Sequence, residues 1–458
     1  MQSNIKDRKT YRLKLNKDFL TIFYLRIVLL TLTSFFIAQN TIGYLRIMSL
    51  IPYQVSHILN WLYLAFIVIT LFTRVVLLVL GKLGFQSWET TLTCILMGWI
   101  TVLHYIWYPH ILEFANIKDF LGMVTSTVVY SWFLFIAGEA LGLMLQSQHI
   151  DFLKWFKVLY ILVVATIIFG IFLGYTLYGQ IFFLTYNPQN RGSYHYQIIG
   201  DSLAILGIFM LGYNTKSNSS SLLLSFYIFT SVVTLFSKSR GSFFGFVLAG
   251  LSMFLVISRT KRKITLKRIV RTMVILTTLV AVIVFLGLSF SSFEEIMSEI
   301  NNLAEPTIAR ITMLLQGEDE SAQQRLEQFR FGTKWIRENW FYGYLMVEIK
   351  DLGKGNYIHN ILSYLVSYGI GPFLLLIWIL LKVGLKVYHE AIHRGRDEKA
   401  LAGLGIYVFI LFQILFVRSY VWSYLWLGIG FLTSVPSGGK ASNLSKLEIS
   451  KSFKNSEQ

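Results

Sequence analysis

Apolar residues occur along this chain in runs about as long as a membrane-spanning helix. A helix rises about 1.5 Å per residue, so about 20 apolar residues cross the hydrocarbon core of a bilayer. The sequence therefore predicts an all-α polytopic membrane protein. Its twelve predicted spans cover approximately residues 19–38, 57–80, 88–108, 120–145, 155–175, 197–213, 221–236, 241–258, 270–290, 359–381, 400–417 and 421–435.

One long polar segment interrupts this pattern. Residues 291–358 contain no long apolar run, and eleven of the chain's 24 acidic residues lie between Ser291 and Tyr357. We predict a large loop with short helices here, between spans 1–9 (19–290) and spans 10–12 (359–435). A basic segment (1–18) precedes the first span, and a polar tail (436–458) with the composition of a disordered segment follows the last one.

Composition supports the membrane class. Of 458 residues 55% are hydrophobic and only 14% are charged, and the mean hydropathy is +0.58. The single cysteine, Cys94, excludes an intrachain disulfide and a thiolate metal cluster. The first apolar run has no small-residue cleavage site, so we expect it to be retained as a helix and not removed as a signal peptide.

The basic residues predict an orientation, because cytoplasmic loops retain Lys and Arg while translocated short loops lose them. If the N-terminus is cytoplasmic, the inner segments carry 26 Lys and Arg residues. The outer short loops carry only Arg46, Lys118, Arg191, Lys238, Arg240 and Arg418. We therefore predict a protein of the cell membrane with both termini in the cytoplasm and the long loop outside. The basic run at 259–271 follows the same rule, so we expect no nucleic-acid partner.

Three of the outer cations are candidates for binding an anion. Lys238 and Arg240 lie in the tight turn 237–242, and Arg191 precedes the sixth span. A guanidinium offers phosphate two parallel hydrogen bonds. Gly241 would allow the backbone to approach a ligand closely, and the serines of the turn would add hydroxyl groups. The alternative is that these cations only extend toward lipid headgroups.

His359, which begins the predicted tenth span, is the candidate general base. Its ordinary pKa of about 6.5 allows it to accept a proton near neutral pH. The alternative is a local cap at the helix start. His195, near Arg191, is a second candidate base. In the long loop, four basic residues lie three to five residues apart, a spacing that places most of them on one side of a helix, namely Arg325, Arg330, Lys334 and Arg337.

Glu139 lies within a predicted span, where a carboxylate is costly and needs a reason. It could couple transport to protons, or it could pair with a buried arginine such as Arg26 or Arg74; we favour the pairing. The sequence has no phosphate-binding P-loop and no HExxH or paired-cysteine metal motif. It also lacks the matching broken helices that are typical of secondary transporters.

Several of these residues resemble motifs of one family. The turn 237–242 resembles the SRG signature of the O-antigen ligase and Wzy-type polysaccharide polymerase superfamily. The segments 324–326 and 340–344 resemble its second block, and His359-Asn360 with the residues up to Gly371 resembles its HN block. One departure is Trp340, which occupies the position of an expected proline.

The resemblance implies a GT-C-like membrane glycosyltransferase that uses an undecaprenyl-pyrophosphate-linked oligosaccharide. His359 would be the catalytic base, and inversion would proceed without a metal or another cofactor. The residues implied to bind the pyrophosphate are Arg191, Arg240, Arg325 and Lys238. Those expected to position the acceptor or the loop are Tyr357, Asn360 and Trp340, with Trp335 as a further aromatic contact to the sugar.

Within the family, a polymerase transfers the glycan to another lipid-linked repeat unit, whereas a ligase transfers it to a different acceptor. We favour a polymerase for capsule, exopolysaccharide or O-antigen, because the aromatic, Lys- and Asn-rich composition is common in Gram-positive organisms, which lack lipid A. A transporter or flippase of lipid-linked sugars is the alternative from another class. Besides the glycolipid and membrane lipids, a flippase and a chain-length regulator are candidate partners.

Overall fold

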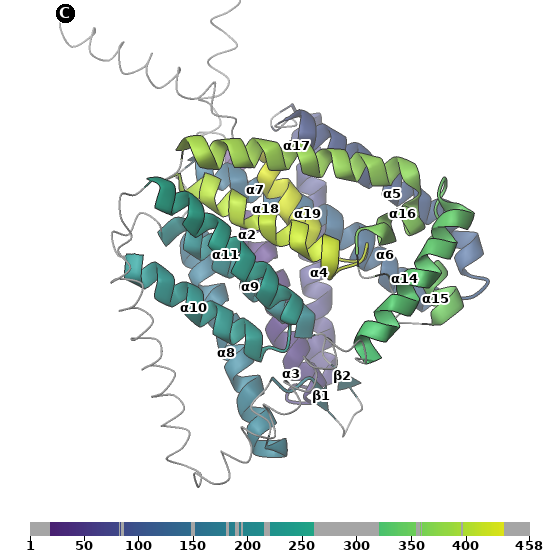
Figure 1. The fold of residues 1–458 in the computed structure, drawn as a ribbon, viewed down its shortest axis with the longest axis horizontal. Coiled ribbons are helices and arrows are strands. Elements are labelled where there is room, and N and C mark those ends of the chain that lie inside the picture. The colour runs from purple at the N-terminus through teal and green to yellow at the C-terminus, as the bar shows by residue number, and fades with distance from the viewer. Residues whose placement is uncertain are drawn as a thin grey trace, which may run out of the picture.

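The computed structural model describes residues 19–81, 83, 87–147, 152–179, 183–187, 192–193, 196–214, 220–260, 320–353, 358, 360–394 and 397–434. Within these residues, nine helices are long and apolar enough to cross a membrane. The protein is an all-helical, multi-pass membrane protein, and its helices pack as one bundle (Figure 1).

The first long helix is continuous through a π-helical segment. It consists of α2 (Phe19–Phe36), η2 (Ile37–Ile42) and α3 (Gly43–Ile47). The fourth is built in the same way from α6 (Ile117–Val124), η3 (Thr125–Val129) and α7 (Tyr130–Ser147). The other long helices are α4 (Tyr53–Val79), α5 (Trp88–Ile111), α8 (Phe152–Tyr178), α9 (Tyr196–Asn214), α11 (Arg240–Thr260), α17 (Ile370–Arg394) and α18 (Glu398–Phe416).

Two of the predicted spans correspond to shorter apolar helices. These are α10 (Ser220–Phe236), of 17 residues, and α19 (Tyr424–Ser434), of 11 residues. The predicted span at 270–290 and the predicted loop up to residue 319 lie outside the described residues. Among the described residues the structure therefore supports nine long spans, where the sequence predicts twelve over the whole chain.

Helices α7 and α19 pack closely through glycine. A Cβ atom added to Gly138 in α7 would lie 2.2 Å from the carbonyl oxygen of Leu427 in α19. One added to Gly430 in α19 would lie 2.1 Å from the carbonyl oxygen of Phe135. Small residues of this kind let two membrane helices approach until their backbones touch. This contact fixes α19, and with it the preceding loop, against the core.

The predicted pairing of Glu139 is confirmed. Its Oε2 atom lies 3.1 Å from Nη2 of Arg74, and both side chains are buried between α7 and α4. Arg74 also donates a 2.6 Å hydrogen bond from Nη1 to the carbonyl oxygen of Leu83. A buried carboxylate that is paired in this way needs no transport role to explain its presence.

The described half of the long loop contains two helices, α14 (Glu320–Asn339) and α15 (Val347–Leu352), beside α16 (Leu362–Tyr368) (Figure 1). The expected basic face of α14 is present among its described side chains, since Arg330, Lys334 and Arg337 are exposed, three or four residues apart. The opposite face is buried. Trp335 packs there with Val347, Ile358 and Val366 in a small core of its own.

The start of the tenth span differs from the prediction. In place of one helix over 359–381, the structure has the short α16 and then α17, which begins at Ile370. Gly369 separates them with φ 78° and ψ −179°, a backbone conformation that is essentially restricted to glycine. Its Cα faces the segment after α14, where a Cβ would lie 2.3 Å from the carbonyl oxygen of Phe341. The apolar run continues through this break, so hydropathy alone could not reveal it.

We expect Gly369→Ala to destabilise the protein by at least about 1–3 kcal/mol, from backbone strain alone. The clash with Phe341 adds to this cost. Gly353 provides a matched control, because it has φ 83° and ψ 175° but open space around its missing Cβ. Thermal unfolding of the purified variants separates the two effects. Equal losses for Gly353→Ala and Gly369→Ala would show that the Phe341 contact contributes nothing.

Candidate functional site

The two predicted cations of the SRG turn lie between α10 and α11. Lys238 has φ 65°, which is unusual for a residue other than glycine, and its carbonyl oxygen accepts a 3.1 Å hydrogen bond from the Arg240 amide. Partial burial lowers the pKa of Lys238 from its ordinary value. Arg240 is the first residue of α11 and is exposed, and its side chain makes no hydrogen bond or ion pair within the described part of the chain. Its guanidinium is therefore available to an anion.

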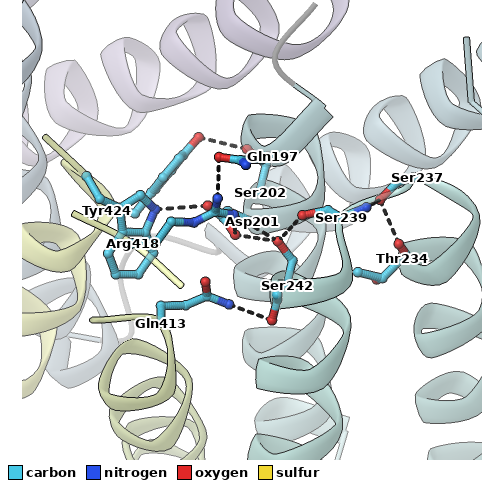
Figure 2. A network of polar contacts seen from close by, with 12 residues as sticks. Gln197, Asp201, Ser202, Thr234, Ser237, Ser239, Ser242, Gln413, Arg418 and Tyr424 are labelled. Carbon is cyan, nitrogen blue, oxygen red and sulfur yellow. Dashed lines mark hydrogen bonds and ion pairs between the residues drawn. The ribbon is translucent and has the colours of Figure 1, made fainter. Parts of the chain in front are cut away.

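The serines of this turn belong to a buried polar network (Figure 2). Arg418, between α18 and α19, places Nη2 2.8 Å from Oδ1 of Asp201 in α9, and both side chains are buried. Trp422 donates from Nε1 to the other carboxylate oxygen at 2.9 Å, and Ser242 of α11 donates to Oδ1. Arg418 also donates to the side-chain oxygen of Gln197. One carboxylate thus ties α9, α11 and the α18–α19 loop together.

This network corrects two expectations about the turn. Ser239 and Ser242 are buried, with their hydroxyl oxygens 2.6 Å apart, so they complete the Asp201 network and do not face a ligand. Gly241 does not admit a ligand either. A Cβ at that position would lie 2.3 Å from Cγ1 of Val417, and its carbonyl oxygen accepts a 2.8 Å hydrogen bond from Gln413. Gly241 therefore allows α11 to pack closely on α18.

A short antiparallel hairpin is attached beside the turn. Its strands are β1 (Tyr186–Asn187) and β2 (Gly192–Ser193). The segment leading into β1 is bonded to the last residue of α10, since the Phe183 amide donates to the carbonyl oxygen of Phe236 at 3.2 Å. At the other end, Asn187 donates to the carbonyl oxygen of Ile47 in α3 at 3.2 Å. The predicted ligand Arg191 and the rival base His195 lie outside the described residues.

The HN segment is held on both sides of its histidine. Ile358 is buried against α14, and the Asn360 side chain accepts a 2.9 Å hydrogen bond from the Leu362 amide at the start of α16. Ser363 in α16 accepts a 2.9 Å hydrogen bond from the Tyr420 amide, two residues after Arg418. The predicted residues His359 and Tyr357 themselves lie outside the described residues. Asn360 is thus assigned a role in fixing the segment, and α16 is linked to the Asp201 network.

The remaining predicted positions divide between exposed and buried. Trp340 follows α14 with 51% of its surface exposed, so its ring is available for contact. The expectation that Trp335 contacts a sugar is wrong. It is 1% exposed, and its Nε1 donates to Oδ2 of Asp351 at 2.7 Å, so it belongs to the core of the loop. Arg325 belongs to α14, but the structure does not describe the position of its side chain.

Asp201, the centre of the network, is not among the candidate residues predicted from the sequence. A signal was present, because Asp201 is the one acidic residue in the apolar run 197–213. An ionisable group at such a position needs a partner. The partner, Arg418, is 217 residues further along the chain, and in the sequence alone it is only one of the outer cations.

Comparison with protein-family models matches residues 225–384 to the O-antigen ligase family, Wzy_C. The chain carries an O-antigen ligase domain. This domain begins within α10 and ends within α17, so it includes the SRG turn, α11, the helices of the long loop and the HN segment. Comparison with curated proteins gave no match. The resemblance predicted from the motifs is thus confirmed, and the O-antigen ligase family acts on lipid-linked glycans in ligase- or polymerase-type transfer.

Proposed function

We propose that the protein is a polysaccharide polymerase that joins undecaprenyl-pyrophosphate-linked repeat units at the outer face of the cytoplasmic membrane. Contacts around the three motif-bearing segments support a common site. The segment that precedes β1 is hydrogen-bonded to Phe236, next to the SRG turn. Ser242, at the end of that turn, is hydrogen-bonded to Asp201 and Arg418. The α18–α19 loop, which contains Arg418, is hydrogen-bonded to α16 through the Tyr420 amide. This chain of hydrogen bonds is the observation that carries the proposal.

The proposed reaction is a single displacement with inversion. An acceptor hydroxyl attacks the anomeric carbon as the bond from that carbon to the pyrophosphate oxygen breaks, and His359 takes the hydroxyl proton. Arg240 and Arg191, assisted by Lys238 and Arg325, bind the pyrophosphate and stabilise the negative charge that develops on the leaving group. Donors that are already aimed at such a charge often contribute the largest part of the rate enhancement. The reaction needs no metal on this account.

We expect His359→Ala to lower the rate of polymerisation by about 10²- to 10⁴-fold, the usual contribution of a general base. Arg240→Ala should lower it by about 10²- to 10³-fold, as for one charge-stabilising donor. Arg240→Lys should also impair it, because a point charge does not reproduce the bidentate fork. The measurement is chain length in a deletion strain complemented with each variant. Lys118→Gln, which removes an exposed cation elsewhere, is the control.

Three outcomes separate this proposal from its alternatives. Unaltered chain length in both alanine variants, at normal protein level, would reject the catalytic assignment. Single repeat units that accumulate on lipid in the deletion strain favour a polymerase over a ligase. Longer glycans formed by purified protein in detergent exclude a protein that only transports, because no compartments are then present.

A further inference from the structure

A polar cavity lies at the side of the bundle where the hairpin is attached. It has a volume of about 140 Å³ and is formed by η2 and α3 on one wall and by α4 on the other, with Ile198 of α9 completing it. The π-helical turn of η2 lines this cavity, and such turns occur frequently at functional sites. Ile47, another lining residue, accepts the hydrogen bond that anchors the hairpin.

The cavity presents hydrogen-bond donors and a positive charge. Arg46 is half-buried in its wall, and the guanidinium has no hydrogen-bond or ion-pair partner within the part of the chain that the structure describes. The amides of Gln39 and Asn60 face the same space, and Gln39 is held by a 3.2 Å hydrogen bond from Nε2 to the Tyr63 hydroxyl. No carboxylate is present among the described residues that line it. This combination favours an anion with several acceptor oxygens.

The size and position of the cavity restrict further which ligand it can hold. A cavity of about 150 Å³ holds a molecule the size of benzene, so this one has room for one phosphate group and little of a sugar. Ile198 is adjacent in sequence to Gln197, which accepts a hydrogen bond from Arg418. The cavity therefore adjoins the Asp201 network on the side of α9 and shares the hairpin with the predicted pyrophosphate site.

We propose that this cavity is a second site for the phosphate of a membrane lipid, separate from the Arg240 site. The identity of that lipid rests on the proposed function: a polymerase must hold two lipid-linked glycans at once, so the Arg46 cavity would bind the phosphate of the acceptor. The same chemistry would also accept the headgroup of an anionic phospholipid. The two sources can be distinguished by competition.

The test uses purified full-length protein in detergent, with undecaprenyl pyrophosphate as the probe and native mass spectrometry to count bound molecules. Wild type should bind two. Arg46→Gln should weaken one of the two binding events by about 10- to 100-fold, the effect of losing a hydrogen bond to a charged group. Asn60→Leu, on the facing wall, should weaken the same event. Lys118→Gln, which removes an exposed cation outside both sites, should change neither.

The outcomes distinguish this site from the proposed donor site. Arg240→Ala should remove the other molecule and leave the Arg46-dependent one in place. If Arg46→Gln and Asn60→Leu leave both binding events unaltered, the second site is rejected while the donor site stands. If Arg240→Ala leaves both binding events unaltered while Arg46→Gln weakens one of them, the donor assignment fails and the second site stands. Displacement of the Arg46-dependent molecule by equimolar phosphatidylglycerol would identify a phospholipid headgroup as its ligand, and resistance to displacement would identify the polyprenyl-linked acceptor.

Discussion

Replacing Asp201 with Asn is expected to destabilise the protein by about 3–5 kcal/mol, because it leaves a buried arginine without its counter-charge. Arg418 lies 2.8 Å from Asp201, and the side chains are 6% and 2% exposed. The carboxylate also accepts hydrogen bonds from Trp422 and Ser242. An amide can accept on only one side, so at least one of these donors would lose its partner.

Thermal unfolding of purified variants in one detergent measures this loss. The double variant Asp201→Asn, Arg418→Met removes both charges and should recover much of the stability, since residues of one network couple strongly. Lys118→Gln is the matched control for loss of a single exposed charge. An Asp201→Asn variant that unfolds at the wild-type temperature would show that the pair does not stabilise the bundle.

The network also holds the turn through Ser242 without making Asp201 a catalytic residue. Ser242 lies two residues after Arg240, and its hydroxyl is fixed by Asp201 and by Ser239. The first turn of α11 is thus held from below while Arg240 projects from it, exposed. Asp201 positions the turn and does not touch the proposed ligand. A folded Asp201→Asn protein should therefore lose affinity for undecaprenyl pyrophosphate through disorder of the turn.

Much of the fold could be predicted, because bilayer thickness imposes a length on every span. Local periodicity also predicted the basic face of α14, where Arg330 and Lys334 are exposed opposite the buried Trp335. The pairing of Glu139 with Arg74 followed from the cost of an isolated charge in a membrane. Each of these inferences depends on a rule that acts within one segment or at one residue.

The features that could not be predicted depend on contacts between distant segments. The sequence suggests that Gly241 faces a ligand, but in the structure Val417 packs against it. The sequence also suggests that Gly369 lies within a continuous helix, but in the structure it faces Phe341 at a break between two helices. Trp335 is an aromatic residue of the kind that contacts sugars, but it is hydrogen-bonded to Asp351 and buried in the core of the loop. A sequence fixes the residue type at each position but not the partner 16 to 217 residues away.

A different large effect is expected from Glu348 in α15, which is fully buried in the loop. Neither carboxylate oxygen accepts a hydrogen bond from another described residue. Burial raises the pKa of Glu348 from 4.5 to about 8, and the residue's own backbone amide offsets only part of this rise. Tyr368, whose charge would act on Glu348, stays neutral because burial holds the pKa of its hydroxyl well above the ordinary value. Glu348 is thus mostly protonated in the folded protein at neutral pH.

The sign of the pH dependence follows from the two pKa values. Below about pH 4.5 the carboxyl group is protonated in both the folded and the unfolded chain, so it has no effect on their balance. Between pH 4.5 and 8 the unfolded chain releases the proton and the folded chain keeps it, so stability falls as pH rises. Above pH 8 the free energy of unfolding is reduced by the full cost of the buried charge, at most on the order of 4 to 5 kcal/mol.

Glu348→Gln should abolish this fall, because the amide cannot ionise. The variant should be about as stable as wild type near pH 5, where both proteins carry a neutral buried group without a partner, and more stable at pH 9, where wild type carries a buried charge. The unfolding temperatures of the two proteins should therefore diverge from pH 5 through pH 7 to pH 9. Glu338→Gln, which removes an exposed carboxyl group from the same loop, should follow wild type. Parallel curves for wild type and Glu348→Gln would mean that Glu348 is ionised or solvated in the folded loop.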